Sequence, residues 1–312
     1  MRKMTSPSNA ALIRRAAALI REGKLVAFPT ETVYGLGANA LDAAAVEKIF
    51  RVKGRPSTSP LIVHVKSRQA ASGFVTDWPP AAEALAAKFW PGPLTLVLPK
   101  RDCIPPIVTA GLPTVGLRVP ANPVALALLS EANVPIAAPS ANRFTELSPT
   151  TAEHVRRSLG AEVDLILDGG PAEVGIESTV LSLAGPVPLL LRPGMISPLQ
   201  IEEIIGAIQV AEAPVEGPHP SPGMHAKHYS PRTPLLLYLP RTGRGAYLWL
   251  TCPAPVPKSV RMPADPARYA AVLYQTLHEL DDECFDWIAV EPPPDSAEWT
   301  GINDRLRRAA AI

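Results

Sequence analysis

The sequence is poor in cysteine. Its 312 residues include three, Cys103, Cys252 and Cys284, which lie far apart and form no Cys-X-X-Cys pair. A disulfide framework and a zinc site are therefore not expected, and we predict no metal-ligating residue set. Such sparse cysteine usage is typical of a reducing compartment, so a cytoplasmic location is expected.

An excess of charge of one sign is also missing. The net charge is +1, and Phe, Trp and Tyr together make up 5% of the residues. A broad nucleic-acid surface needs basic side chains with aromatic rings among them, so both values argue against one. The one local exception is residues 48–68, which hold six Lys or Arg and no acid. This segment is a candidate anion site.

Long hydrophobic runs are absent as well. No apolar stretch approaches the roughly 18–20 residues that a membrane-spanning helix needs. Arg14, Arg15 and Arg21 interrupt the apolar pattern near the N-terminus, so no signal peptide is predicted there. We therefore expect no membrane partner.

Proline, in contrast, is abundant at 37 residues, and its distribution divides the chain. Strand-like and helix-like patterns alternate over residues 1–207 and predict an α/β domain with a mixed sheet. Residues 208–234 contain six prolines and little periodicity, which indicates a semi-rigid linker. Residues 235–312 return to alternating patterns and predict a small second α/β domain.

A glycine-rich stretch at residues 35–40 matches the pattern GxGxxA of dinucleotide-binding loops. That fingerprint requires the glycines directly between a strand and a helix, with an acid about 20 residues later. Here the preceding predicted strand ends seven residues earlier, and Arg55-Pro56 stands where the acid should be. We interpret the stretch as a turn before a helix capped by Asp42.

Polar and cationic side chains lie where several predicted strands begin or end. In open α/β sheets, ligands bind at the carboxyl ends of the strands. Each feature also has a structural interpretation: a basic turn can be merely solvated, and a lone strand histidine such as His64 is more often structural. A buried arginine needs an anion, which a ligand or an internal glutamate could supply. The stretches concerned are 29–36, 53–61 with His64 after it, Arg118, 139–142, 178–179 and 192–194.

Five of these motifs, in this order and spacing, resemble those of the YrdC-like threonylcarbamoyl-AMP synthases. The resemblance covers about residues 10–207. The GMHAKHYSP segment at 223–231 and the NDRL segment at 303–306 are similar to the longer, two-domain form of that family. The five motifs are PTETVYGL at 29–36, KGRPSTSPL at 53–61, PSAN at 139–142, ESTV at 177–180 and RPG at 192–194.

The resemblance implies an enzyme, a nucleotidyltransferase that makes L-threonylcarbamoyl-AMP from L-threonine, bicarbonate and ATP and releases pyrophosphate. A separate transferase then modifies adenosine 37 of tRNA, so tRNA is an indirect partner. It also implies a twisted mixed α/β sheet around a deep cavity, over which the linker folds. Mg²⁺ is expected to accompany ATP, without a dedicated carboxylate cage.

The resemblance also assigns residues to the two substrates. Thr32, His64, Arg118, the Ala138 backbone and Ser178 are expected to hold L-threonine, with Arg118 pairing with its carboxylate. ATP is expected to be held by Lys53, Arg55, Ser59, Thr114, Ser140, Asn142, Ser148 and Arg192, with Tyr229 of the linker covering it. Thr114, Ala138, Ser148 and Tyr229 rest on the resemblance alone.

One departure from the family pattern falls between Asn142 and Ser148. The family usually has a Ser-Gly pair where this chain has Phe144-Thr145. Because threonine is not expected to adopt the positive φ that glycine allows, the loop conformation, and with it the phosphate contact of Ser148, is expected to change.

Two alternatives differ from this enzyme. One is an RNA-binding protein of the same fold without adenylylation activity, suggested by the basic segment 48–68. The other is the related carbamoyl-transfer enzyme of hydrogenase maturation, whose zinc-finger-like regions the scattered cysteines exclude.

Overall fold

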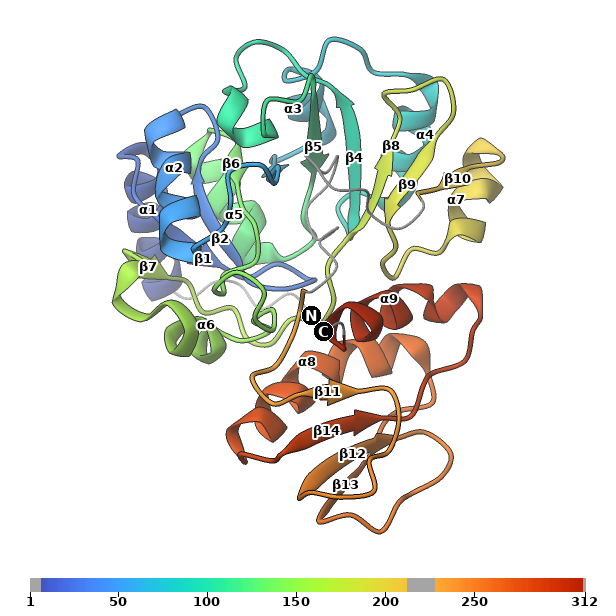
Figure 1. Cartoon of the computed structure of the whole chain (residues 1–312). Helices are drawn as coiled ribbons and strands as arrows, with labels where there is room; N and C mark the ends of the chain where they lie inside the picture. Colours follow the sequence, from blue (N-terminus) through green and yellow to red (C-terminus); the bar gives the residue numbers. More distant parts are fainter. Residues whose placement is uncertain (1–6, 212–227, 311–312) are drawn as a thin grey trace.

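The computed structural model describes residues 7–211 and 228–310 (Figure 1). Residues up to 211 surround a large mixed sheet, and a second, smaller parallel sheet follows from residue 235. The predicted α/β architecture with a mixed sheet and a small C-terminal α/β part is confirmed. The middle of the predicted linker, residues 212–227, lies outside the described residues.

The large sheet has the strand order β10-β9-β8-β4-β5-β3-β6-β2-β1-β7. The sheet is mixed: some neighbours pair parallel, such as β3 with β5, and others antiparallel, such as β4 with β5. The β3–β5 register sets His64 beside Arg118, two residues predicted to hold the same substrate. The strands are β1 (Val26–Phe28), β2 (Gly35–Asn39), β3 (Ile62–His64), β4 (Leu94–Pro99), β5 (Thr114–Arg118), β6 (Ile136–Ala137), β7 (Leu165–Ile166), β8 (Thr179–Ser182), β9 (Leu189–Arg192) and β10 (Gln209–Val210).

The interpretation of residues 35–40 as a turn is wrong. Most of the stretch forms β2, which pairs antiparallel with β1. A side chain on Gly37 would lie 2.8 Å from both the Phe28 ring and Ile136, so the glycine allows the neighbouring strands to pack closely. The stretch is therefore a glycine-bearing strand, and the rejection of a dinucleotide loop stands, because no helix begins at these glycines.

Helices cover both faces of the large sheet. Ala27 packs with Ile49 of α2 in one apolar cluster, whereas its neighbour Phe28 packs with Ile20 of α1 and Leu128 of α5 in another. As predicted, Asp42 caps α2 by accepting from two backbone N–H groups. No helix of the described residues is long and apolar enough to cross a membrane. The helices are α1 (Pro7–Arg21), α2 (Ala43–Lys53), α3 (Arg68–Ser72), α4 (Pro80–Phe89), α5 (Pro123–Ala132), α6 (Ala152–Leu159) and α7 (Pro198–Ile205), with short 3₁₀ turns at Pro106–Thr109 and Gly160–Glu162.

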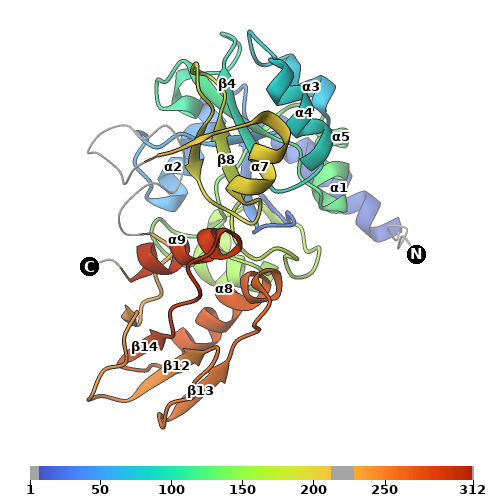
Figure 2. The same cartoon turned by 90° about the vertical axis from the view of Figure 1, so that its right-hand side faces the viewer.

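The C-terminal part places its helices against the large sheet. In Figures 1 and 2, α8 and α9 lie between the two sheets. Its apolar core continues into the first part, because Val33, Leu147 and Ile176 pack in one cluster with Leu273 and Tyr274 of α8. The small sheet has the order β11-β14-β12-β13, from β11 (Leu235–Leu236), β12 (Gly245–Trp249), β13 (Lys258–Arg261) and β14 (Trp287–Val290), and the helical elements are α8 (Pro266–Asp282), a 3₁₀ turn (Ala297–Trp299) and α9 (Thr300–Ala309).

Candidate active site

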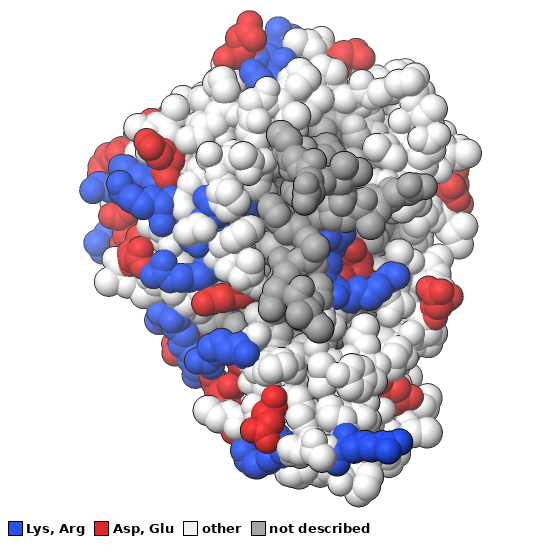
Figure 3. Space-filling view, in the orientation of Figure 1, with Lys and Arg blue, Asp and Glu red and all other residues white. Residues whose placement is uncertain are grey.

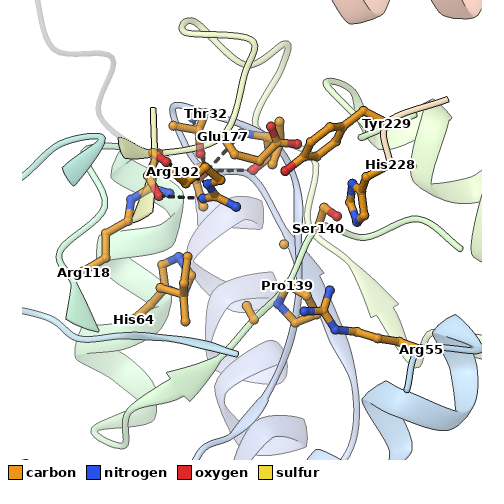
Figure 4. A pocket seen from close by; sticks show the side chains of 16 residues that line it. Thr32, Arg55, His64, Arg118, Pro139, Ser140, Glu177, Arg192, His228 and Tyr229 are labelled. Carbon is orange, nitrogen blue, oxygen red and sulfur yellow. Dashed lines mark hydrogen bonds between the residues drawn. The ribbon is translucent and has the colours of Figure 1, made fainter. Parts of the chain in front are cut away.

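A cavity lies where the polar segments of the large sheet meet the described end of the linker (Figure 4). Its empty volume, open mouth included, is about 520 Å³. All five residues predicted for L-threonine line it, and so do four of those predicted for ATP. These nine residues are Thr32, His64, Arg118, Ala138, Ser178, Arg55, Ser140, Arg192 and Tyr229.

One end of the cavity holds a buried ion pair. Arg118 Nη2 donates to Glu31 Oε1 at 2.7 Å, and both side chains are nearly inaccessible, at 4% and 6%. Glu31 Oε2 also accepts from the Ala121 backbone N–H at 2.9 Å, and Arg118 Nε donates to the Gly92 carbonyl at 3.3 Å. The internal glutamate that the sequence left open as a partner of Arg118 therefore exists, and it is Glu31.

His64 and Thr32 lie beside this pair. His64 is buried, and its Nδ1 finds no hydrogen-bond partner among the described residues. Burial, and then the charge of Arg118, lower the pKa of the His64 imidazole to about 3, so it is neutral at physiological pH. The Thr32 hydroxyl lies 2.8 Å from that of Thr30, whose own hydroxyl bonds the Val33 carbonyl and holds the loop after β1 in place.

The opposite end of the cavity is formed by Arg55 and Ser140 (Figure 4). Arg55 Nη2 donates to Ser59 Oγ at 2.5 Å and to the Pro60 carbonyl at 3.2 Å, while its Nε has no hydrogen-bond partner among the described residues. Burial lowers the pKa of the Arg55 guanidinium to about 10, which leaves it charged. The motif that carries it thus presents a buried cation to the cavity.

Arg192 enters between these ends from the last residue of β9. Its Nε donates to the Ser178 carbonyl and its Nη2 to the Ser178 hydroxyl, both at 3.1 Å. That hydroxyl also lies 2.8 Å from the Thr95 hydroxyl on β4. Three arginines, two of them from the motifs and Arg118 from the end of β5, therefore reach one cavity, which suits an anionic ligand.

Five predicted ATP residues do not line this cavity. The Lys53 ammonium donates instead to the backbone carbonyls of Ser140, at 2.6 Å, and Asn142. Burial and the neighbouring Arg55 lower the Lys53 pKa. Lys53 thus holds the 139–142 loop from behind. Of the other four, Ser59 accepts a hydrogen bond from Arg55, and Ser148 donates one to Glu177. The Asn142 amide donates to the Arg143 and Glu146 carbonyls. Thr114 lines a neighbouring pocket instead.

The sequence assigned no role to Glu177, although it opens the fourth motif. Its Oε1 accepts from Ser148 Oγ at 2.5 Å, and its Oε2 accepts from Arg305 Nε at 2.6 Å and from the Tyr274 hydroxyl at 3.2 Å. Burial by itself raises the Glu177 pKa, but the charges of Arg305 and Arg192 bring it below the ordinary value. Glu177 is therefore ionised and joins Ser148, Tyr274 and Arg305 in one hydrogen-bonded group. In the sequence, only the NDRL segment at 303–306 pointed to its partner Arg305.

The expectation for Thr145 is wrong. Thr145 has a φ of 71°, so it adopts the left-handed conformation that glycine would favour there. The Ser230 backbone N–H donates to its carbonyl at 2.9 Å, and Glu146 forms a β-bridge with Ser230. The end of the linker thus holds Thr145 in a left-handed conformation, at a cost in backbone strain.

Tyr229, which precedes Ser230 in the linker, is 1% exposed and has a φ of 62°. Its ring lies 4.0 Å from that of His228, which also lines the cavity and which the sequence did not single out. In Figure 4 the Tyr229 ring points toward Glu177 and Arg192, and the His228 ring lies near Ser140.

Two family models together span most of the chain. Residues 18–194 match the Sua5/YciO/YrdC model, described as telomere recombination, and residues 196–311 match the C-terminal domain of threonylcarbamoyl-AMP synthase. The chain belongs to the threonylcarbamoyl-AMP synthase family. The resemblance predicted from the five motifs, including the longer two-domain form, is confirmed.

Individual relatives agree with this assignment. The threonylcarbamoyl-AMP synthase of Bacillus subtilis is 44% identical over 96% of this chain and 92% of its own length. That of Pyrococcus abyssi is 49% identical over 72% of this chain and 67% of its own. The crystal structure of P. abyssi Sua5 complexed with L-threonine matches with a TM-score of 0.91 at 39% identity, covering 96% of this chain and 94% of the other.

Proposed function

We propose that this protein is an L-threonylcarbamoyladenylate synthase, a nucleotidyltransferase acting on L-threonine, bicarbonate and ATP. The observation that carries the proposal is the convergence of Arg55, Arg118 and Arg192, each from a different part of the chain, on one cavity. Membership in the threonylcarbamoyl-AMP synthase family and the likeness to a threonine-bound relative support it.

L-Threonine is proposed to bind at the Arg118 end. Arg118 supplies a fixed positive charge for the substrate carboxylate, and Thr32 and Ser178 supply hydroxyls within the same cavity. His64 stays neutral beside Arg118, so it can accept a hydrogen bond from an ammonium or hydroxyl group. The buried Glu31 restrains the guanidinium in one position before the substrate arrives.

ATP is proposed to bind toward Arg55, Ser140 and Arg192, with the Tyr229 ring over the nucleotide. In the reaction, the neutral threonine amine and bicarbonate form the N-carboxylate and release water. An oxygen of that carboxylate then attacks the α-phosphorus of ATP, and pyrophosphate leaves. Such a displacement depends on positioning and charge stabilisation more than on a protein nucleophile. The buried arginines can supply both.

Mg²⁺ is proposed to arrive with ATP. Among the described residues that line the cavity, Glu177 is the one that carries a carboxylate. Its oxygens already accept hydrogen bonds from Ser148, Tyr274 and Arg305. No group of three or more potential metal ligands occurs in the described part of the chain. This supports the proposal that phosphate oxygens and water, rather than a cage of protein carboxylates, hold the ion.

The product is an activated acyl adenylate, which a separate transferase is proposed to consume when it modifies adenosine 37 of tRNA. Contact of this chain with tRNA would then be indirect. The alternative of an RNA-binding protein gains no support: on the face in Figure 3, Lys and Arg are interspersed with Asp and Glu rather than gathered in one patch.

The test is pyrophosphate release from ATP and bicarbonate, with L-threonine, with L-serine and without an amino acid. We expect release that depends on L-threonine, and its loss in Arg55→Ala. Arg51→Ala is the matched control, because Arg51 lies one turn away and is exposed. Release that is independent of L-threonine, or unchanged in Arg55→Ala, would contradict the proposal.

A further inference from the structure

The C-terminal part contributes a buried cation that pairs with Glu177, a residue of the cavity wall. Arg305 of α9 is 1% exposed, and it donates to the Glu177 carboxylate at 2.6 Å and to the Glu177 backbone carbonyl at 3.3 Å. Its Nη1 donates to the Pro193 carbonyl at 3.1 Å and to Asp304 at 2.7 Å. One side chain thus fastens α9 to both the ESTV and the RPG motif.

The approach of α9 to these motifs depends on glycine. A Cβ atom on Gly301 would lie 2.6 Å from the Gly194 carbonyl oxygen, closer than real Cβ atoms come. The helix therefore rests directly on the backbone of the RPG motif. Arg305 follows four residues later, on the same face of the helix.

Arg305 is linked to the nucleotide end of the cavity by two routes. The first runs through Glu177, whose other carboxylate oxygen accepts from the Ser148 hydroxyl at 2.5 Å. The second runs through Tyr229, because the Arg305 guanidinium lies 5.0 Å from the centroid of its ring. Glu177 and Tyr229 both line the cavity, whereas Ser148 bonds Glu177 without lining it.

Tyr229 in particular needs such a support. Its φ of 62° is unfavourable for a bulky residue and persists only where the surroundings hold it. Those surroundings belong largely to the C-terminal part, since Tyr274 of α8 stacks 6.2 Å from Tyr229 and the two share an apolar cluster with Leu273.

We propose that Arg305 is a positioning residue, through which the C-terminal domain sets the Glu177 and Tyr229 side chains of the cavity for ATP. The predicted change in KM rests on the proposed function, because it is measured by turnover. The predicted change in ATP affinity does not, because ATP binding is measured directly. The proposal predicts an effect on one substrate only. Among the described residues, Arg118 donates to Glu31 and to the Gly92 carbonyl, and His64 packs against Phe28, so both residues of the threonine end should be unaffected.

The test compares Arg305→Met and Arg305→Lys with Arg307→Ala, a control that removes an exposed charge from the same helix. ATP affinity is measured by calorimetry, and KM for each substrate by pyrophosphate release. In Arg305→Met we expect the Kd and KM for ATP to rise about 10–100-fold, as for a displaced contact, with the KM for L-threonine nearly unchanged. Arg305→Lys should recover part of the loss, because it restores the charge between Glu177 and Tyr229.

A purely structural role would instead lower the amount of folded enzyme without separating the two KM values. Unchanged ATP affinity in folded Arg305→Met overturns the proposal. If that variant does not fold, Arg305→Lys and Tyr274→Phe decide, and unchanged ATP affinity in both overturns it. Wild-type protein that binds ATP but shows no threonine-dependent turnover would refute the function while leaving this test intact; wild-type protein that binds no ATP would refute both.

Discussion

Replacement of Glu31 by glutamine tests whether Arg118 is the site of the substrate carboxylate. The change keeps an oxygen that can accept from the Ala121 N–H, and it removes the charge opposite Arg118. Breaking a buried ion pair by removing one partner costs about 3–5 kcal/mol, because the remaining charge is uncompensated. Arg118 keeps its bond to the Gly92 carbonyl and faces the cavity, so we expect the low end, about 3 kcal/mol.

L-Threonine should restore part of this loss. In Glu31→Gln the substrate carboxylate meets an unpaired guanidinium, whereas in the wild type it must share Arg118 with Glu31. A hydrogen bond to a charged group contributes about 1.5–3 kcal/mol, so saturating L-threonine should stabilise the variant by at least about 1.5 kcal/mol more than the wild type.

The assay is urea denaturation with and without L-threonine, repeated with L-threonine amide, which lacks the carboxylate. Glu162→Gln is the matched control, because the Arg143–Glu162 pair has both side chains 45% exposed and should contribute less than about 1 kcal/mol. The reasoning is refuted if Glu31→Gln is as stable as the wild type, or if the amide stabilises it as well as L-threonine does.

Three further predictions follow from single contacts. Thr145→Gly should raise the free energy of unfolding by about 1 kcal/mol, because it relieves a left-handed threonine, and a lower urea midpoint than wild type would contradict this. Lys53→Met should cost about 2 kcal/mol in urea denaturation and raise the KM for ATP, because the 139–142 loop loses its buried donor; a change in KM without any loss of stability would instead favour direct phosphate contact. Unfolding free energy should fall as the pH drops from about 6.5 to about 4. Burial and His278 lower the pKa of the His154 imidazole to about 4, and burial lowers that of His64 to about 3, so the unfolded chain binds protons there that the folded chain does not. His154→Gln should flatten that slope in urea titrations at several pH values, and an unchanged slope would show that other groups set it.

Much of the site was readable because its residues cluster along the sequence. The motifs follow or precede buried strands, and strand ends that meet at one edge of a sheet bring their side chains together. Arg118, Arg192 and Ser178 could therefore be assigned to one polar pocket from the sequence. Arg55 was predicted separately as part of an anion-binding loop, and His64 was assigned by the resemblance; the cavity is lined by all five. The α/β class followed from the same alternation of patterns.

Side chains whose role depends on distant partners were not readable in this way. Lys53 sits in the most basic motif, yet its ammonium turns to two carbonyls some 90 residues away in the sequence, which no local pattern could indicate. Thr145 shows the converse, since the local preference against positive φ was outweighed by a backbone bond from Ser230. The β2 strand was missed because glycine has a low strand propensity. The reason for its glycines, the close packing of the Phe28 ring against them, is visible only in the tertiary structure.

The sequence by itself thus determined the fold class and which chemical groups gather at the strand ends, because both follow from local periodicity and spacing. Only the tertiary structure decided which groups face the cavity and which support it. Glu31, Glu177 and Arg305 are buried charges, and a buried charge must find a counterpart wherever the chain folds back to supply one. For Glu177 that counterpart lies 128 residues later, in the C-terminal domain.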